Sequence, residues 1–485
     1  MDRSNIWIHI GLAVVLVSFA AVLGRIDRMA SSLRTDHKRE IERLSPAPGI
    51  PPAKAAAAAP EVLVRFKRGT TLERIRDIAF KNNDRVYDEI EAVNGLVAID
   101  DLDDADAAEV ARQYAAFENV EYAEPNVSIR LDDPIQKDTP RDLVFRSDSG
   151  QPNDPNFPEQ WALNNLGQNG GTERADIDAL RAWQASKGSE DVVVAVLDSG
   201  VDYRHSDLAE NIWTRPASVP EYFDDERGRM DDLHGFDGTS AAVSDNDVET
   251  RISDPMDDNG HGTHCAGIIG AVGNNGIGIT GVNWNVRIMP LKFLGSGGSG
   301  STDKAIEAIN YAIERKKAGV NVRVISASWG STTRSQALED TIRAAGDAGI
   351  LFVAAAGNDG SNTDVWPHYP SSYKLPNLIS VAAVDRNDAL ASFSNFGAKT
   401  VDLAAPGKDI LSTWLGDDYR EASGTSMATP FVSGVAALII SQTPNITVKQ
   451  LRKKLLDSVD KSDALKGKVA SGGTLCAANA LGIED

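Results

Sequence analysis

The sequence predicts an α/β protein, in which a doubly wound parallel sheet forms a large domain and a small α+β domain precedes it. Short, continuous apolar runs recur in residues 153–485, as in "DVVVAVLDSG", "VRVISASWG", "ILFVAAAGN" and "LISVAAVD". Segments with helical periodicity separate these runs, as in "TDKAIEAINYAIERKKAG" and "SQALEDTIRAAGDAG". Strands buried on both faces give such runs, and their alternation with helices is typical of a parallel sheet. Upstream, residues 61–131 combine strand-like and helical patterns within a much shorter unit.

The N-terminus carries an apolar run from Ile6 to Gly24, which has nearly the length needed to span a bilayer. We interpret residues 1–24 as a signal peptide or a signal anchor, and therefore expect export. The Arg- and Lys-rich segment that follows favours a cytoplasmic location for that side by the positive-inside rule. Whether the run is cleaved or retained therefore stays open. Residues 25–60 have the composition of a charged stalk and a Pro/Ala-rich linker.

The small unit at 61–131 has strand-like patterns in "EVLVRFKRG", "GLVAIDDL" and "VEYAEPNVSIRL". Helical periodicity predicts helices in "TLERIRDIAFKNN", with Thr71 as the N-cap, and in "DADAAEVARQYAAF". This order predicts helices packed on an antiparallel sheet. Residues 132–152 are polar and contain prolines, so we expect a second linker before the large domain at 153–485.

Composition argues against nucleic-acid binding and excludes a disulfide scaffold. The chain has 485 residues and a formal net charge of −21 at pH 7. Nucleic-acid binding requires basic patches that neutralise phosphate, so this acidic balance argues against it. The chain has two cysteines, Cys265 and Cys476, which excludes a disulfide scaffold. We interpret Cys265 as a small buried side chain rather than as a nucleophile.

Polar residues stand where strands of the large domain are predicted to end. Asp198 ends "VVVAVLDSG", Asn358 ends "LFVAAAGN", and the turn 328–330 ends "SASWG". Sites in parallel sheets form at the carboxyl ends of the strands. "ASGTSMATPFVSG" puts Ser426 at the start of an apolar helix, and "NGHGTHCAG" offers His261 at the start of another.

These residue types suit nucleophilic catalysis. A serine hydroxyl needs a base that takes its proton, and an aspartate can orient a histidine for that task. Asn358 can donate an N–H to an oxyanion, together with the Ser426 backbone. A zinc site on His261 and His264 is an alternative, but it needs at least a third protein ligand, and no H-E-x-x-H pattern is present.

Four segments, "VAVLDSGVD", "NGHGTHCAGIIG", "AAAGN" and "GTSMATPFVSG", resemble in this order the signature blocks of the subtilisin-like serine proteases, the subtilases or peptidase family S8. The Asp, His, Ser chain order agrees with that family. The resemblance covers residues 154–483 and implies a subtilisin-like catalytic domain that acts on polypeptides without an organic cofactor. It implies Asp198 as orienting acid, His261 as general base, Ser426 as nucleophile and Asn358 as oxyanion donor. The unit at 61–131 resembles the family's inhibitory, ferredoxin-like propeptide.

The same resemblance assigns binding residues. It implies that "LGSGGSGS" and "SASWG" are the two edges of a peptide cleft, contributed by Gly298, Ser328, Trp329 and Gly330, and that Gly357 allows close approach of the substrate backbone. Asp359, His368 and Trp329 are expected to border specificity pockets. A structural calcium ion is expected, because oxygen ligands suit this cation. Its implied ligands are Asp154, Asp207, Asn275 and the carbonyls of Gly273, Ile277 and Ile279.

Together these features predict an exported serine endopeptidase that is made as an autoprocessed zymogen. Its own propeptide would be an intramolecular inhibitor, and its processing site would lie in the linker at 132–152. The enzyme would be a membrane-anchored precursor, held by the N-terminal segment before processing, or a secreted extracellular protein. The alternative is a catalytically silent peptide-binding protein with the subtilase fold, and the intact candidate residues argue against it.

Overall fold

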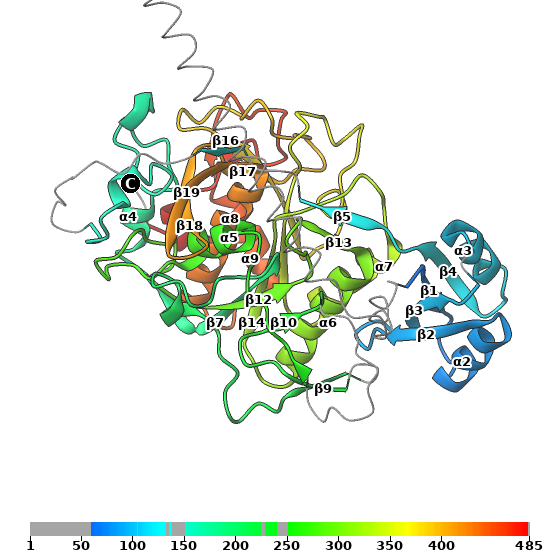
Figure 1. The fold of residues 1–485 in the computed structure, drawn as a ribbon. Helices are drawn as coiled ribbons and strands as arrows, with labels where there is room; N and C mark the ends of the chain where they lie inside the picture. The colour runs from blue at the N-terminus through cyan, green and yellow to red at the C-terminus, as the bar shows by residue number, and fades with distance from the viewer. Residues whose placement is uncertain are drawn as a thin grey trace, which may run out of the picture. The chain divides into compact units, whose positions relative to one another are not determined.

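The computed structural model describes residues 60–103, 105–131, 135–137, 151–224, 228–239 and 251–483. These residues belong to one compact unit, which begins at Ala58 (Figure 1). The predicted membrane segment, the stalk with its Pro/Ala-rich linker up to residue 59, and most of the predicted linker at 132–152 lie outside the described residues.

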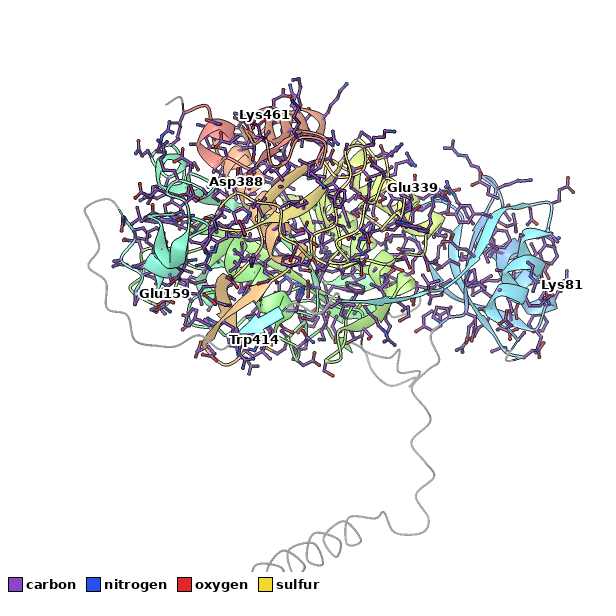
Figure 2. All side chains as sticks on the ribbon, turned by 90° about the horizontal axis from the view of Figure 1, so that it is seen from above. Lys81, Glu159, Glu339, Asp388, Trp414 and Lys461 are labelled. Carbon is purple, nitrogen blue, oxygen red and sulfur yellow. The ribbon has the colours of Figure 1, made fainter. Side chains whose placement is uncertain are left out.

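The small domain is a four-stranded antiparallel sheet in the order β2-β3-β1-β4. Its strands are β1 (Val62–Phe66), β2 (Asp84–Glu89), β3 (Leu96–Asp101) and β4 (Val120–Pro125). Helices α2 (Leu72–Lys81) and α3 (Ala107–Ala115) form a hydrophobic core with one face of this sheet. Lys81, at the end of α2, lies on the outer side of the domain (Figure 2). The predicted cap is confirmed, because the Thr71 hydroxyl accepts the Arg74 N–H at 3.3 Å.

The large domain is built on a nine-stranded sheet in the order β10-β12-β7-β14-β15-β16-β17-β21-β20 (Figure 1). All neighbouring strands except the β21–β20 pair at one edge are parallel, which confirms the predicted doubly wound sheet. The strands are β7 (Gly188–Asp198), β10 (Phe236–Asp237), β12 (Asn285–Lys292), β14 (Val322–Ala327), β15 (Leu351–Ala355), β16 (Leu378–Val384), β17 (Leu403–Pro406), β20 (Asp460–Lys461) and β21 (Gly473–Thr474).

Helices cover both faces of this sheet. One face packs against α6 (Thr302–Lys317) and α7 (Gln336–Asp347), together with part of the small domain. The other face packs against α4 (Ala179–Ala182), α5 (His261–Gly270), α8 (Thr425–Gln442), α9 (Val448–Asp457) and α10 (Ala477–Leu481). Among the described residues, α8 is the one helix long and apolar enough to cross a membrane, but 89% of that window is buried inside the domain. We therefore regard α8 as a core helix.

Short elements complete the fold. Strand β5 (Ser128–Arg130) pairs with β13 (Ser299–Ser301), and β19 (Asp418–Ser423) lies between β18 (Ile410–Trp414) and β6 (Ile135–Lys137). A third small sheet contains β8 (Tyr222–Asp224), β9 (Gly228–Asp231) and β11 (Arg251–Ile252). Within the described ranges, short 3-10 helices occur at η1 (Phe157–Glu159), η2 (Gln168–Gly170) and η3 (Ala209–Asn211).

Candidate active site

Asp198 and His261 form a buried pair at the carboxyl edge of the large sheet. Asp198 is the last residue of β7, and His261 is the first residue of α5. His261 Nδ1 lies 2.8 Å from Asp198 Oδ1, and the two residues are 1% and 0% exposed. Because a carboxylate only accepts hydrogen bonds, Nδ1 must be the donor, and Nε2 is then the basic nitrogen of the neutral ring.

The turn before α5 is held by Asp257, which the sequence analysis did not single out. Its carboxylate accepts five hydrogen bonds, from the backbone of Asn259, Gly260 and Thr263 and from the hydroxyls of Ser199 and Thr263. Burial raises the pKa of Asp257 in spite of these donors. Since Ser199 directly follows Asp198, this carboxylate connects the end of β7 with the start of α5.

Ser426 is the second residue of α8, and its hydroxyl donates to the Ser328 carbonyl at 3.0 Å. Pro430, four residues further along the helix, has no N–H that could bond to the Ser426 carbonyl. The Ser328 hydroxyl donates to that carbonyl instead, at 2.8 Å. Two hydrogen bonds between Ser328 and Ser426 therefore tie the turn after β14 to the start of α8.

Asn358 presents its side-chain amide close to Ser426. Its Oδ1 accepts the backbone N–H of Thr425 at 2.8 Å and the Thr425 hydroxyl at 2.9 Å. These two donors fix which end of the amide is oxygen. The Nδ2 atom is buried, and it donates to no acceptor within the described residues. The site thus holds a fixed donor that an oxyanion can accept.

Residues 128–131 of the chain itself lie between the two predicted edges of the cleft. Strand β5 runs antiparallel to β13, and the Leu131 N–H donates to the Gly298 carbonyl at 2.9 Å. On the other edge, Arg130 forms an antiparallel bridge with Gly330. The Trp329 side chain is 1% exposed and donates to the Leu197 carbonyl at 2.9 Å, so the indole lies in the core beneath this edge.

His264 lies one turn deeper in α5 and has different contacts. Its Nε2 lies 3.1 Å from the Ile410 carbonyl and 3.0 Å from the Arg420 carbonyl. Both partners only accept, so Nε2 carries the proton and offers no lone pair to a metal. Burial lowers the pKa of His264 to about 3. The ring is therefore a neutral link between α5 and the β18–β19 hairpin, which removes Nε2 from the zinc alternative.

The predicted calcium ligands Asp154, Asp207 and Asn275 lie together. Asp154 accepts the Asn274 N–H at 2.7 Å, and Asn275 Nδ2 donates to Asp207 at 2.8 Å. Both carboxylates are buried, and burial together with the charge of Asp154 raises the pKa of Asp207 to about 6. Gly273, Ile277 and Ile279 belong to the same loop, and the Ile279 N–H donates to Asp207 at 2.9 Å. Two buried carboxylates among oxygen donors fit a calcium ion, which would offset their burial.

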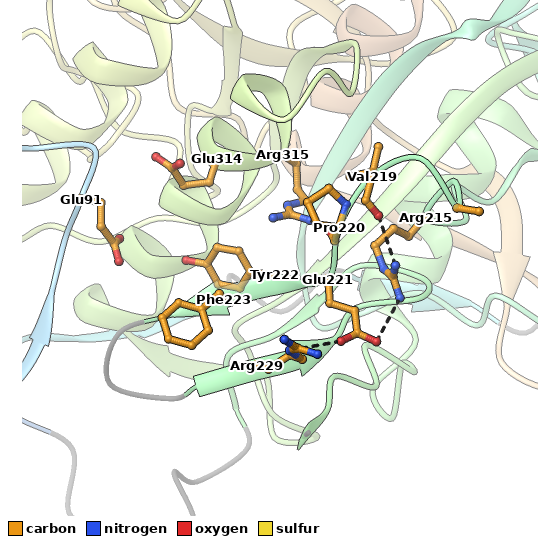
Figure 3. Close-up of a pocket in the computed structure, with 11 residues that line it drawn as sticks. Glu91, Arg215, Val219, Pro220, Glu221, Tyr222, Phe223, Arg229, Glu314 and Arg315 are labelled. Atoms are coloured by element: carbon orange, nitrogen blue, oxygen red, sulfur yellow. Dashed lines mark hydrogen bonds and ion pairs between the residues drawn. The ribbon is translucent and has the colours of Figure 1, made fainter. Parts of the chain in front are cut away.

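A depression of about 780 Å³ lies beside the β8–β9 hairpin, and its lining includes none of the residues above (Figure 3). Three of its charged side chains form ion pairs with one another. Glu221 lies 3.7 Å from Arg229 and 3.8 Å from Arg215. These ion pairs give Glu221, Arg215 and Arg229 a structural role.

Comparisons with known proteins show which family the chain is similar to. Residues 189–473 match the model of the subtilase family, and this range contains all four candidate catalytic residues. The chain is 34% identical over 417 residues to the thermophilic serine proteinase of Bacillus sp. strain AK1, covering 84% of each protein. It is 37% identical over 285 residues to thermitase of Thermoactinomyces vulgaris, covering 59% of this chain and 86% of thermitase. A solved protease structure from Pseudoalteromonas arctica PAMC 21717 matches with a TM-score of 0.55 and 30% identity, covering 68% of this chain and 99% of that one.

Proposed function

The chain belongs to the subtilase family and is a serine-type endopeptidase, and we propose that it is an exported member, made as a zymogen that cuts itself. The observation that carries this proposal is the pairing of the chain's own Ser128–Leu131 segment with both edges of the cleft beside Ser426. An extended peptide that adds a strand to such edges is held by main-chain hydrogen bonds.

In the proposed reaction, the Ser426 hydroxyl turns from Ser328 toward His261, whose Nε2 takes its proton. The serine oxygen attacks the peptide carbonyl, and Asp198 stabilises the imidazolium that forms. Asn358 Nδ2 and the Ser426 N–H donate to the oxyanion. His261 then returns the proton to the leaving amine, and water hydrolyses the acyl-enzyme by the same route in reverse.

We further propose that the small domain is the inhibitory propeptide. Glu124 accepts hydrogen bonds from the Ser335 hydroxyl at 2.6 Å and from the backbone of Gln336 and Ala337 at 2.9 and 3.1 Å, at the start of α7. Asn126 exchanges two hydrogen bonds with Asp303 at the start of α6, at 2.7 and 3.1 Å. A carboxylate at a helix N-terminus is favourable, because the unsatisfied N–H groups and the helix dipole attract it. These contacts support a domain that docks on both helices and holds its trailing strand in the cleft.

Backbone pairing on both sides of the nucleophile supports self-cleavage. Leu131, which precedes the stretch 132–134, pairs with Gly298. Ile135, which follows that stretch, pairs with Ser423, and Ser423 lies three positions before Ser426 in the sequence. We therefore place the first cut between Leu131 and Ile135, within or beside the predicted linker. Because the apolar N-terminal segment precedes this cut, processing would release the catalytic domain from a membrane-anchored precursor.

A structural calcium ion is the cofactor that we propose. The carboxylates of Asp154 and Asp207, the Asn275 side chain and carbonyls of the 273–279 loop would hold it. When bound, the ion supplies positive charge that neutralises the two buried carboxylates. Hydrogen bonds from Asn275 Nδ2 and from the Ile279 N–H hold the Asp207 carboxylate against this loop.

The proposal is tested by expressing wild type and Ser426→Ala in a protease-deficient host. Wild type should yield a processed enzyme that a fluorophosphonate probe labels, whereas Ser426→Ala should accumulate at full length in the membrane fraction without label. Ser441→Ala, on the same helix, is the matched control and should process and label normally. Trimming of Ser426→Ala to the wild-type size would refute self-processing, and an unlabelled, folded wild type would support the silent peptide-binding alternative.

A further inference from the structure

One linear stretch of the small domain, residues 122–131, makes polar contacts with the large domain along its length. It begins in β4, an edge strand that pairs with β1 on one side only. Every second side chain, at Tyr122, Glu124 and Asn126, forms a hydrogen bond with the large domain, as expected for the side chains on one face of an extended peptide. The stretch then continues into β5, which pairs with β13 at the cleft.

The central contact of this stretch is the Glu124 carboxylate at the start of α7. It accepts hydrogen bonds from the Ser335 hydroxyl at 2.6 Å and from the backbone N–H groups of Gln336 and Ala337 at 2.9 and 3.1 Å. N–H groups of a first helical turn have no partner within the helix, and the helix dipole favours negative charge beside them. Ser335 is 4% exposed. The carboxylate therefore occupies a site built from a buried hydroxyl and two backbone donors.

The large domain alone holds these donors in place. The Ser335 N–H donates to the Tyr373 hydroxyl at 3.1 Å, and that hydroxyl donates to the Ser335 carbonyl at 2.6 Å. As the N-cap of α7, the Ser335 hydroxyl also accepts the Leu338 N–H at 3.0 Å. Because none of these partners belongs to the small domain, we expect the site to persist once that domain is gone.

Two neighbouring contacts determine the direction and register of the bound stretch. The Tyr122 hydroxyl donates to Asp340, one turn along α7, at 2.9 Å. Asn126 exchanges two hydrogen bonds with Asp303 at the start of α6, at 2.7 and 3.1 Å. All of these contacts come from a strand-like peptide and its side chains. An extended segment of a substrate can therefore present the same groups without the rest of the small domain.

We propose that the starts of α6 and α7 form an exosite for linear protein substrates, and that this exosite selects a Glu at the position of Glu124. The inference rests on the proposed function, because it requires removal of the small domain and catalysis by Ser426. Glu124 precedes Leu131 by seven residues, which span about 23 Å in an extended chain. The exosite thus recognises a part of the substrate far from the cut bond. The folded small domain binds more tightly than such a segment, because Arg65 of β1 adds an ion pair with Asp340.

Internally quenched peptides test the inference on processed wild type, which is purified away from its small domain after expression of the full chain. The reference peptide copies residues 120–137, and two variants carry Glu124→Gln or Glu121→Gln. Glu121 is the matched control, because its partner is Arg65 at 3.1 Å, which the peptide lacks. The value of kcat/KM should fall about tenfold for Glu124→Gln, the order expected for a charged hydrogen-bond acceptor, and should stay unchanged for Glu121→Gln.

Gln336→Pro removes one donor from the enzyme without breaking a hydrogen bond of the helix. Gln336 is the first residue of α7, where proline is accepted, and the extended backbone of Ser335 (φ −117°, ψ 125°) suits a residue before proline. The ratio of kcat/KM between the reference and the Glu124→Gln peptide should fall in this variant. Gln336→Ala retains the N–H and should keep the wild-type ratio. Because each ratio is taken within one enzyme, differences in the amount of folded protein cancel.

Equal kcat/KM values for the reference and Glu124→Gln peptides on wild type overturn the inference, and the α6–α7 face then serves the folded small domain alone. A similar loss for Glu121→Gln also overturns it, because the effect is then a general attraction of acidic peptides. An unchanged ratio in Gln336→Pro assigns the Glu to another site. If Gln336→Pro does not fold, the peptide comparisons on wild type still decide.

The fluorophosphonate probe separates failure of the exosite from failure of the proposed function. An enzyme that is labelled but leaves the reference peptide uncut overturns the exosite, because the linear stretch is then not recognised. A folded enzyme that the probe does not label refutes the proposed function instead.

Discussion

Alanine substitutions of His264 and His261 should have opposite consequences, although the two residues lie one turn apart on α5. In His264→Ala, the carbonyls of Ile410 and Arg420 lose their shared donor, at a cost of about 1–3 kcal/mol for buried groups left unsatisfied. Removing a fully buried ring adds a cavity, so the total destabilisation should be about 3–5 kcal/mol. That is a large part of the 5–15 kcal/mol that typically stabilises a protein.

The pH dependence gives this prediction a second signature. The folded-state pKa of His264 is lowered from 6.5 to about 3, so between these values the unfolded chain binds a proton that the native protein does not. The contribution of His264 is therefore complete above pH 6.5 and is lost as the pH falls toward 3. At pH 5 the loss is about 2 kcal/mol, since one pKa unit corresponds to about 1.4 kcal/mol. The cost of His264→Ala should shrink by that amount between pH 8 and pH 5.

Urea unfolding at pH 8 and pH 5 measures both effects, in a Ser426→Ala background that prevents self-digestion. His234→Ala is the control for a histidine outside the site, and it should destabilise far less. In the active background and at low temperature, His264→Ala should still label with fluorophosphonate. His261→Ala should lose labelling and up to about 10⁶-fold in turnover, a magnitude borrowed from triad substitutions in subtilisin. A folded His264→Ala enzyme without label, or one whose destabilisation is independent of pH, would refute the reasoning.

Three further outcomes are expected. Asn358→Ala should lower kcat by about 10²–10³-fold with little change in KM, a range known from subtilisin for loss of one oxyanion donor, and steady-state kinetics on titrated enzyme check it. Removal of calcium with EGTA should lower the free energy of unfolding by about 3 kcal/mol relative to a calcium level a hundredfold above Kd. Calorimetry should find that calcium raises the free energy of unfolding of Asn275→Ala much less than that of wild type. An equal calcium effect in both proteins would refute the assigned ligands. The small domain, added in trans to the catalytic domain, should inhibit at least about tenfold more weakly when it carries Glu124→Ala, because the N–H groups at the start of α7 lose their acceptor. The same domain with Glu73→Ala, on the outer helix α2, should inhibit as strongly as the unchanged domain.

The sequence predicts the large sheet well because strand burial and motif order are both local signals. Apolar runs correspond to β7, β14, β15 and β16, and the polar residues at the ends of β7 and β15 meet at one edge, as parallel topology requires. Strand β2 was missed for a physical reason. Its sequence, "DRVYDE", is mostly charged, which an edge strand tolerates because only one of its sides is paired.

The residues that hold the candidate site in place are harder to predict from the sequence, because their hydrogen-bond and ion-pair partners are distant along the chain. Asp257 stands next to Asp258, and nothing local separates their roles. Asp257 turns inward to five donors, whereas Asp258 forms an ion pair with Lys292 at 2.6 Å. The signal in the sequence is the apolar flank of Lys292, the cation that ends the run "IMPLK". A buried lysine requires a partner, and its ammonium also donates to the Ser199 carbonyl at 2.6 Å.

Proline and glycine show how far local reasoning extends into the site. Pro430 by itself implies that the Ser426 carbonyl lacks its helical donor, which any reader of the sequence can deduce. The identity of the replacement donor, Ser328, depends on how β14 packs against α8. In the same way, Gly330 indicates that something approaches the backbone closely, and the fold determines that it is His368. Local rules therefore show where a hydrogen-bond donor is missing or where a close contact occurs. Tertiary packing determines which residue supplies the donor or makes the contact. For that reason, the side chain that packs against Gly330 lies outside all four signature blocks.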